Sequence, residues 1–160
     1  MIWPALFKQL LTDPMGALTS PAFYLQHTGE LSIDGLGWVW QCNFFGHFVL
    51  SRLLESSLAA SPVQGGGRVI WSSSLEASPK HYDPSDWQNK KTGHSYENTK
   101  YQIDIVANTL DIQNMKTNRR IRHLVSQPGV TSTNVASALI GPALDVLKVW
   151  CFYIVSHLGK

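Results

Sequence analysis

The chain has 160 residues, of which 44% are hydrophobic and 11% aromatic, so its composition fits one globular domain and excludes a disordered chain. Its net charge is only +2, and its basic residues are dispersed apart from 90–91 and 119–122, which argues against a nucleic-acid partner. Cys42 and Cys151 lie in apolar segments without a metal-binding spacing. We therefore expect no metal site and a reducing, intracellular setting.

The first part of the chain predicts irregular structure followed by a long helix. Residues 1–37 are rich in glycine and proline, and we expect only a short helix near 5–11. Residues 38–58 contain no strong helix breaker except Gly46 and carry apolar side chains on nearly every face. Such a helix is buried between layers or lies at an interface.

The middle of the chain predicts a strand, a helix and a second strand. Residues 68–73 read as a short buried strand, and a polar loop over 78–93 leads to a helix over about 94–115. Residues 121–126 form the second strand. This order predicts two parallel strands joined by a crossover helix, and so an α/β fold. The apolar side of the helix is formed by Ile103, Val106, Ala107 and Leu110.

Polar residues follow both predicted strands, and ligands of parallel sheets bind at those ends. Ser72-Ser73-Ser74 follows the first strand and Gln127-Pro128-Gly129 the second. On the helix between them, Tyr96 and Lys100 are four residues apart and share one face. A nearby cation favours the phenolate, which makes a tyrosine usable as a proton donor. Taken singly, the three serines also fit the cap of a strand, and the Tyr96/Lys100 pair also fits two neighbours on a helix surface. Pro128-Gly129 alone also fits a plain turn.

Together with Asn43, these motifs stand in the order found in the short-chain dehydrogenase/reductase family, which the chain resembles. The resemblance implies a partial doubly wound, Rossmann-like parallel sheet. It also implies NADPH as the cofactor, with NAD as the alternative. The implied catalytic residues are Asn43, Ser74 (with Ser73 as the register alternative), Tyr96 and Lys100. The implied cofactor-binding residues are Tyr96, Lys100, Pro128, Gly129, Val130, Thr131 and Thr133.

A narrower resemblance rests on residues 29–37, on the run 43–48 and on a loop containing Asp86-Trp87. These segments look like those of the fungal 3-keto-sterol reductases of ergosterol-type sterol biosynthesis. That resemblance implies hydride transfer to the C3 ketone of a sterol. Tyr96 would donate the proton, Ser74 would hydrogen-bond the oxygen, Lys100 would favour the phenolate and hold the nicotinamide ribose, and Asn43 would position Lys100.

The chain departs from this family in its nucleotide-binding part. The sequence contains no Gly-x-x-x-Gly-x-Gly turn and no Asn-Ala-Gly segment before residue 38. We therefore expect residues 1–160 to form one partial domain lacking the N-terminal nucleotide-binding βαβ half, and to bind NADPH weakly or not at all. Two explanations stay open: a fragment of an active reductase, or a truncated paralogue without catalysis that serves as an interaction module.

The resemblance also implies partners. The helices 38–58 and 94–115 correspond to a dimer interface of the family, which predicts a homodimer. Residues 139–158 are apolar but interrupted by Pro142, Asp145 and Lys148, which disfavours a membrane-spanning helix and favours an interfacial or buried one. For a membrane-dissolved sterol substrate, we expect a location at the endoplasmic reticulum membrane or the lipid droplet surface.

Overall fold

The computed structural model describes residues 8–9, 11–13, 28–129, 146, 149–150, 153 and 157. The chain divides into two compact units, Met1–Gly129 and Val130–Lys160, and the fold is described here for residues 28–129 of the first. The helices expected near 5–11 and over 139–158 fall largely outside the described residues. The same holds for three of the cofactor-binding candidates, which are Val130, Thr131 and Thr133.

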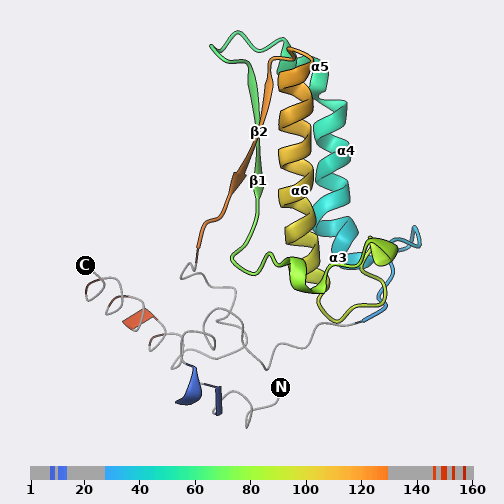
Figure 1. Cartoon of the computed structure of the whole chain (residues 1–160), viewed down its shortest axis with the longest axis vertical. Coiled ribbons are helices and arrows are strands. Elements are labelled where there is room, and N and C mark those ends of the chain that lie inside the picture. Colours follow the sequence, from blue (N-terminus) through green and yellow to red (C-terminus); the bar gives the residue numbers. More distant parts are fainter. Residues whose placement is uncertain are drawn as a thin grey trace. The chain divides into compact units, whose positions relative to one another are not determined.

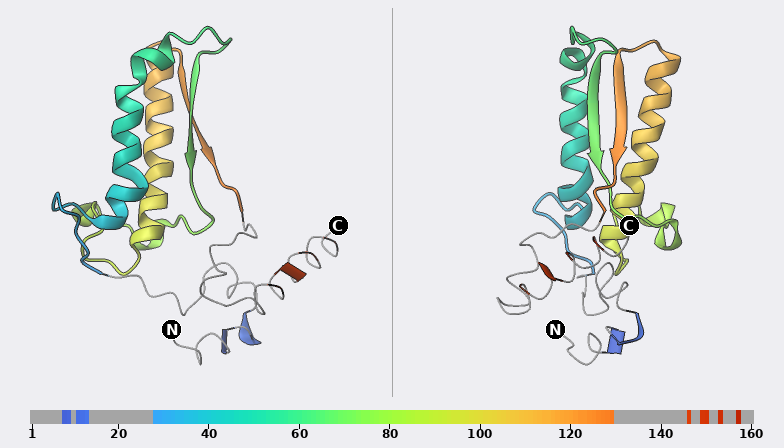
Figure 2. Two further views of the ribbon diagram at one scale, coloured as in Figure 1. Left: turned by 180° about the vertical axis from the view of Figure 1, so that it is seen from behind. Right: turned by 90° about the vertical axis from the view of Figure 1, so that its left-hand side faces the viewer.

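The described unit is an α/β structure built on two parallel strands. β1 (Gly67–Ser72) and β2 (Ile121–Ser126) pair in register from Gly67 opposite Ile121 to Ser72 opposite Ser126. The helix α6 (Ser95–Lys116) connects them, as the sequence predicts. The helices lie on one face of this sheet (Figures 1 and 2). In the described part of the chain, no second helical layer covers the other face, where Ile70 is 67% exposed.

The segment predicted as one helix over 38–58 consists of four consecutive helical pieces. These are α3 (Trp38–Trp40), the π-helical turn η1 (Gln41–Phe45), α4 (Gly46–Leu53) and α5 (Glu55–Ala59). In the wider η1 turn the rings of Trp40 and Phe45, five residues apart, stack with their centroids 4.9 Å apart. Of the two positions expected for this segment, burial between layers is wrong for α4, which exposes one apolar side, and a position at an interface stays a prediction. The exposed residues of that side are Val49, Leu50, Leu53 and Leu54.

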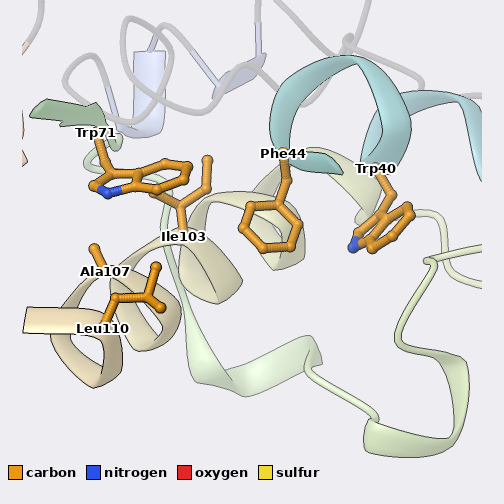
Figure 3. Packing of buried hydrophobic residues seen from close by; sticks show 6 residues of the cluster. All are labelled: Trp40, Phe44, Trp71, Ile103, Ala107 and Leu110. Atoms are coloured by element: carbon orange, nitrogen blue, oxygen red, sulfur yellow. The ribbon is translucent and has the colours of Figure 1, made fainter. Parts of the chain in front are cut away.

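The core lies between the sheet and the helices (Figure 3). It takes side chains from the start of the first helical segment, from β1 and from α6, and its members are Trp40, Phe44, Trp71, Ile103, Ala107 and Leu110. The residue before β1 packs closely against the residue before β2. A Cβ on Gly66, whose φ is +82°, would lie 1.9 Å from the Arg120 carbonyl oxygen, so only glycine fits before β1.

Polar contacts attach the loop before α6 to the first half of that helix. The loop contains two short turns of helix, η2 (Pro79–His81) and η3 (Pro84–Asp86). Asn98 Nδ2 donates to the His81 carbonyl at 2.8 Å, and Gln102 Nε2 donates to the Trp87 carbonyl at 2.9 Å. Both helix residues are buried, so these bonds fix the loop against α6.

Among the described residues, no helix combines the length and apolar character needed to cross a membrane. Within the same residues, no group of three or more His, Cys, Asp or Glu side chains is arranged to hold a metal ion.

His123 of β2 is buried in a hydrogen-bonded contact beneath the helices. Trp71 Nε1 donates to His123 Nδ1 at 3.1 Å, and the His123 backbone N–H donates to Asp111 Oδ1 at 2.9 Å. Asp111 also accepts two hydrogen bonds from Arg122 at 2.8 and 3.0 Å, which holds the pKa of its carboxyl below the usual value. Burial lowers the pKa of His123, against the opposing effect of Asp111. The folded protein thus favours the neutral imidazole.

We expect Asn98→Ala to lower the free energy of unfolding by about 1–3 kcal/mol, because it leaves the partly buried His81 carbonyl of the loop without its donor. The matched control is Asn108→Ala, the same change at an exposed position of α6, which is expected to stay within about 0.5 kcal/mol. Urea denaturation of the three proteins measures both values. Equal effects of the two substitutions would contradict the role assigned to Asn98.

The burial of His123 makes the stability of the fold dependent on pH. Below the ordinary histidine pKa of about 6.5 the unfolded chain binds a proton that the folded chain resists, so the free energy of unfolding falls as the pH drops through this window. At higher pH the full contribution is present. His123→Asn keeps an acceptor for Trp71 but cannot titrate. Urea midpoints at pH 7.5 and 5.5 should differ less in this variant than in the parent protein, and an unchanged difference would rule His123 out as the cause.

Candidate active site at the strand ends

The carboxyl ends of β1 and β2 lie side by side and carry the polar segments that the sequence places there. The Ser73 backbone N–H donates to the Ser126 carbonyl at 2.9 Å, and Gln127 Nε2 donates to the Ser74 carbonyl at 3.3 Å. These two bonds join the segments that follow the strands. Gly129, two residues further on, has φ +73°, a conformation that favours glycine, and no atom of the described residues is within 4 Å of the position a Cβ would take.

Tyr96 and Lys100 lie together at the start of α6, as their spacing predicts. The Lys100 Nζ atom is 5.5 Å from the centroid of the Tyr96 ring. The same ammonium donates a hydrogen bond to the Ser72 carbonyl oxygen at 2.9 Å. Lys100 therefore links the helix that carries the tyrosine to the end of the strand that precedes the serines.

Lys100 and Asn43 line the same groove between α4 and β1. The groove has a volume of about 430 Å³. Its polar lining residues are Asn43, His47, Ser51, Arg68, Ser72 and Lys100, and its apolar lining includes Leu50, Leu54 and Leu58. Asn43 Nδ2 donates to the Val39 carbonyl at 3.1 Å, which fixes the side chain on the π-helical turn. The structure thus brings Asn43 and Lys100 to one cavity, although the sequence places them 57 residues apart.

The serines differ in what their hydroxyl groups can do. The Ser73 side chain is buried, with 4% of the residue exposed, and its Oγ has no hydrogen-bond partner among the described residues. Ser74 is less buried, and its Oγ accepts a hydrogen bond from the Glu76 backbone N–H at 3.1 Å. That bond leaves the Ser74 O–H able to donate to a ligand. The geometry favours Ser74 over the register alternative Ser73 as a donor toward solvent.

Electrostatics at the site centre on Lys100. Burial lowers the pKa of its ammonium, while the carboxylate of Asp104 opposes that shift. Sequence reasoning missed Asp104, although it follows Lys100 by four residues and so shares its helix face. It also missed His47, which follows Asn43 by four residues and lines the same groove. The spacing alone could have found both.

The site fits the nicotinamide end of a dinucleotide better than its pyrophosphate. A hydroxyl, an ammonium and the open backbone at Gly129 lie where parallel sheets bind ligands. By contrast, the sequence contains no glycine-rich phosphate turn of the expected spacing. The residues in the described part of the chain thus fit the nicotinamide end of a pyridine dinucleotide.

Comparison with known proteins finds relatives named 3-keto-steroid reductase. The chain is 32% identical over 157 residues to the 3-keto-steroid reductase of Schizosaccharomyces pombe, a match covering 98% of the chain and 44% of the relative. It is 30% identical to that of Candida glabrata and 28% identical to that of Saccharomyces cerevisiae, each over 99% of the chain and 44% of the relative. The chain thus spans less than half the length of these relatives. No protein-family model matches the sequence, and no solved structure matches it.

Proposed function

The chain is a homologue of the fungal 3-keto-steroid reductases, and on this premise we propose that it carries the reducing site of an NADPH-dependent 3-keto-sterol reductase. The observation that carries the proposal is the contact of Lys100 with both the Tyr96 ring and the end of β1. A doubly wound, Rossmann-like sheet in the whole enzyme is part of the same proposal. The setting we propose is the endoplasmic reticulum membrane or the lipid droplet surface, where a sterol ketone is dissolved.

In this proposal each residue has one task. NADPH, when bound, supplies the hydride that reduces the C3 ketone. The Tyr96 hydroxyl gives its proton to the ketone oxygen, and the Lys100 ammonium, 5.5 Å from the ring, stabilises the phenolate that is left. The Ser74 O–H donates a hydrogen bond to the same oxygen while that oxygen gains charge. Asn43 lines the groove beside Lys100 and helps to position it.

The proposal predicts that the proton donor can be removed without loss of the fold. Tyr96→Phe should lower the rate of 3-keto-sterol reduction by about 10²-fold or more, because it removes general acid catalysis. The matched control is Tyr101→Phe, a tyrosine five residues further along α6 whose ring packs against Tyr82, and it should keep the parent rate. The measurement is sterol product formation at millimolar NADPH, since we expect weak cofactor binding. Equal rates for the two variants would overturn the assignment of Tyr96.

A second function is favoured by the exposed side of α4. Apolar residues on successive turns, among them Val49 and Leu53, are 37% and 75% exposed, and exposed apolar patches of this kind mark interaction surfaces. On α6, Ile105 and Ile112 are exposed as well. We infer that these helices form a homodimer interface, which a catalytically inactive paralogue would retain as an interaction module.

The dimer is tested by sedimentation of the purified chain at micromolar concentration. We expect a dimer for the parent protein and a monomer for Leu53→Glu, since the new charge would be buried without a partner. The control is Ile33→Glu, a fully exposed position in the loop before α3, which should remain dimeric. A monomeric parent protein would contradict the interface. A dimer without sterol reduction would favour the interaction module over the enzyme.

A further inference from the structure

Asp104 lies one helical turn beyond Lys100 and has a buried oxygen that makes no hydrogen bond. The two side chains are four residues apart on α6, so their Cβ atoms are about 5–6 Å apart on one face of the helix. Asp104 Oδ1 has no hydrogen-bond partner among the described residues. Buried carboxylate oxygens normally accept a donor, so a hydrogen bond to the fold does not explain why an acidic residue stands here.

None of the described residues that line the groove with Lys100 is acidic. The titratable and charged groups that share the groove with Lys100 are His47 of α4 and Arg68 of β1. Tyr96 precedes Lys100 by one turn of the same helix. Burial of a half-buried ammonium favours the neutral amine, because desolvation disfavours the charged form.

We propose that Asp104 is a positioning residue, whose carboxylate keeps the Lys100 side chain charged and held against the end of β1. A cation at this point can donate to the Ser72 carbonyl, 2.9 Å away, and stay beside the Tyr96 ring. A neutral amine would be a weaker donor and would not stabilise a phenolate. The opposing effects of burial and of Asp104 on the pKa of Lys100 agree with this assignment.

This inference deepens the proposed function, because it concerns the same lysine, but its test needs no catalysis. The charge of Lys100 is measured by competitive acetylation of the intact protein over a range of pH, followed by mass spectrometry of the peptides. Only the neutral amine reacts, so the rate reports the deprotonated fraction. Lys80 and Lys116, both exposed, serve as internal references in every sample. Absence of sterol reduction would count against the proposed function and leave this measurement unaffected.

The expected result is specific to the charge of residue 104. Asp104→Asn should raise the labelling rate of Lys100 at pH 8 by about tenfold, because loss of the carboxylate lowers the pKa of Lys100 and so increases the fraction of neutral amine. Asp104→Glu keeps the charge and should restore the parent rate. The control for loss of any one negative charge is Asp34→Asn, at an exposed residue whose carboxylate accepts only from Gln41 among the bonds described.

Two outcomes would overturn the proposal. One is a Lys100 labelling rate that changes no more in Asp104→Asn than in Asp34→Asn. The other is an equal change in Asp104→Glu, which would mean that shape at this position matters and charge does not. If Asp104→Asn does not fold, Asp104→Ser removes the charge without placing an amide in the half-buried site, and the same tenfold rise is expected there.

Discussion

The placement of the site depends on the hydrogen bonds between buried polar residues of α6 and the loop before it. Asn98 and Gln102 each donate to a loop carbonyl, and both lie within the two turns that also carry Tyr96 and Lys100. Because buried donors and acceptors are costly to leave unpaired, these bonds define one position of the loop on the helix. Polar contacts therefore orient the functional half of α6, while its second half is held by apolar packing through Ala107 and Leu110 and by the hydrogen bonds that Asp111 accepts from β2.

The parallel pairing of β1 and β2 turns this oriented helix into a site. Parallel strands present their carboxyl ends at one edge, so residues after each strand meet although α6 separates them in sequence. The bond from Gln127 to the Ser74 carbonyl and the bond from the Ser73 N–H to the Ser126 carbonyl join these two strand ends directly. A hydrogen bond from Trp71 of β1 to His123 of β2 joins the same two strands on the side covered by the helices. The imidazole of His123, which can titrate, is therefore part of the structure that holds the site in place.

Much of this arrangement could be predicted because it follows from short-range patterns. The limits of β2 agree with the sequence prediction, and the Tyr96/Lys100 contact follows from helical spacing alone. The π-helical turn at Gln41–Phe45 was not predictable, since its stacked Trp40 and Phe45 rings depend on packing against the rest of the core. The choice between Ser73 and Ser74 depended on burial, which a run of three serines does not reveal.

Lys100 shows why residue types alone do not settle how a site works. A lysine next to a tyrosine stabilises a phenolate only while it is charged, and burial in the groove works against that charge. None of the described residues that line the groove is acidic, so the carboxylate that opposes the effect of burial comes from Asp104, on the helix that carries the lysine. The motif Tyr-x-x-x-Lys thus does not by itself explain how Lys100 stays charged. With Asp104 one turn further on, the three residues form a continuous row of phenol, ammonium and carboxylate along α6.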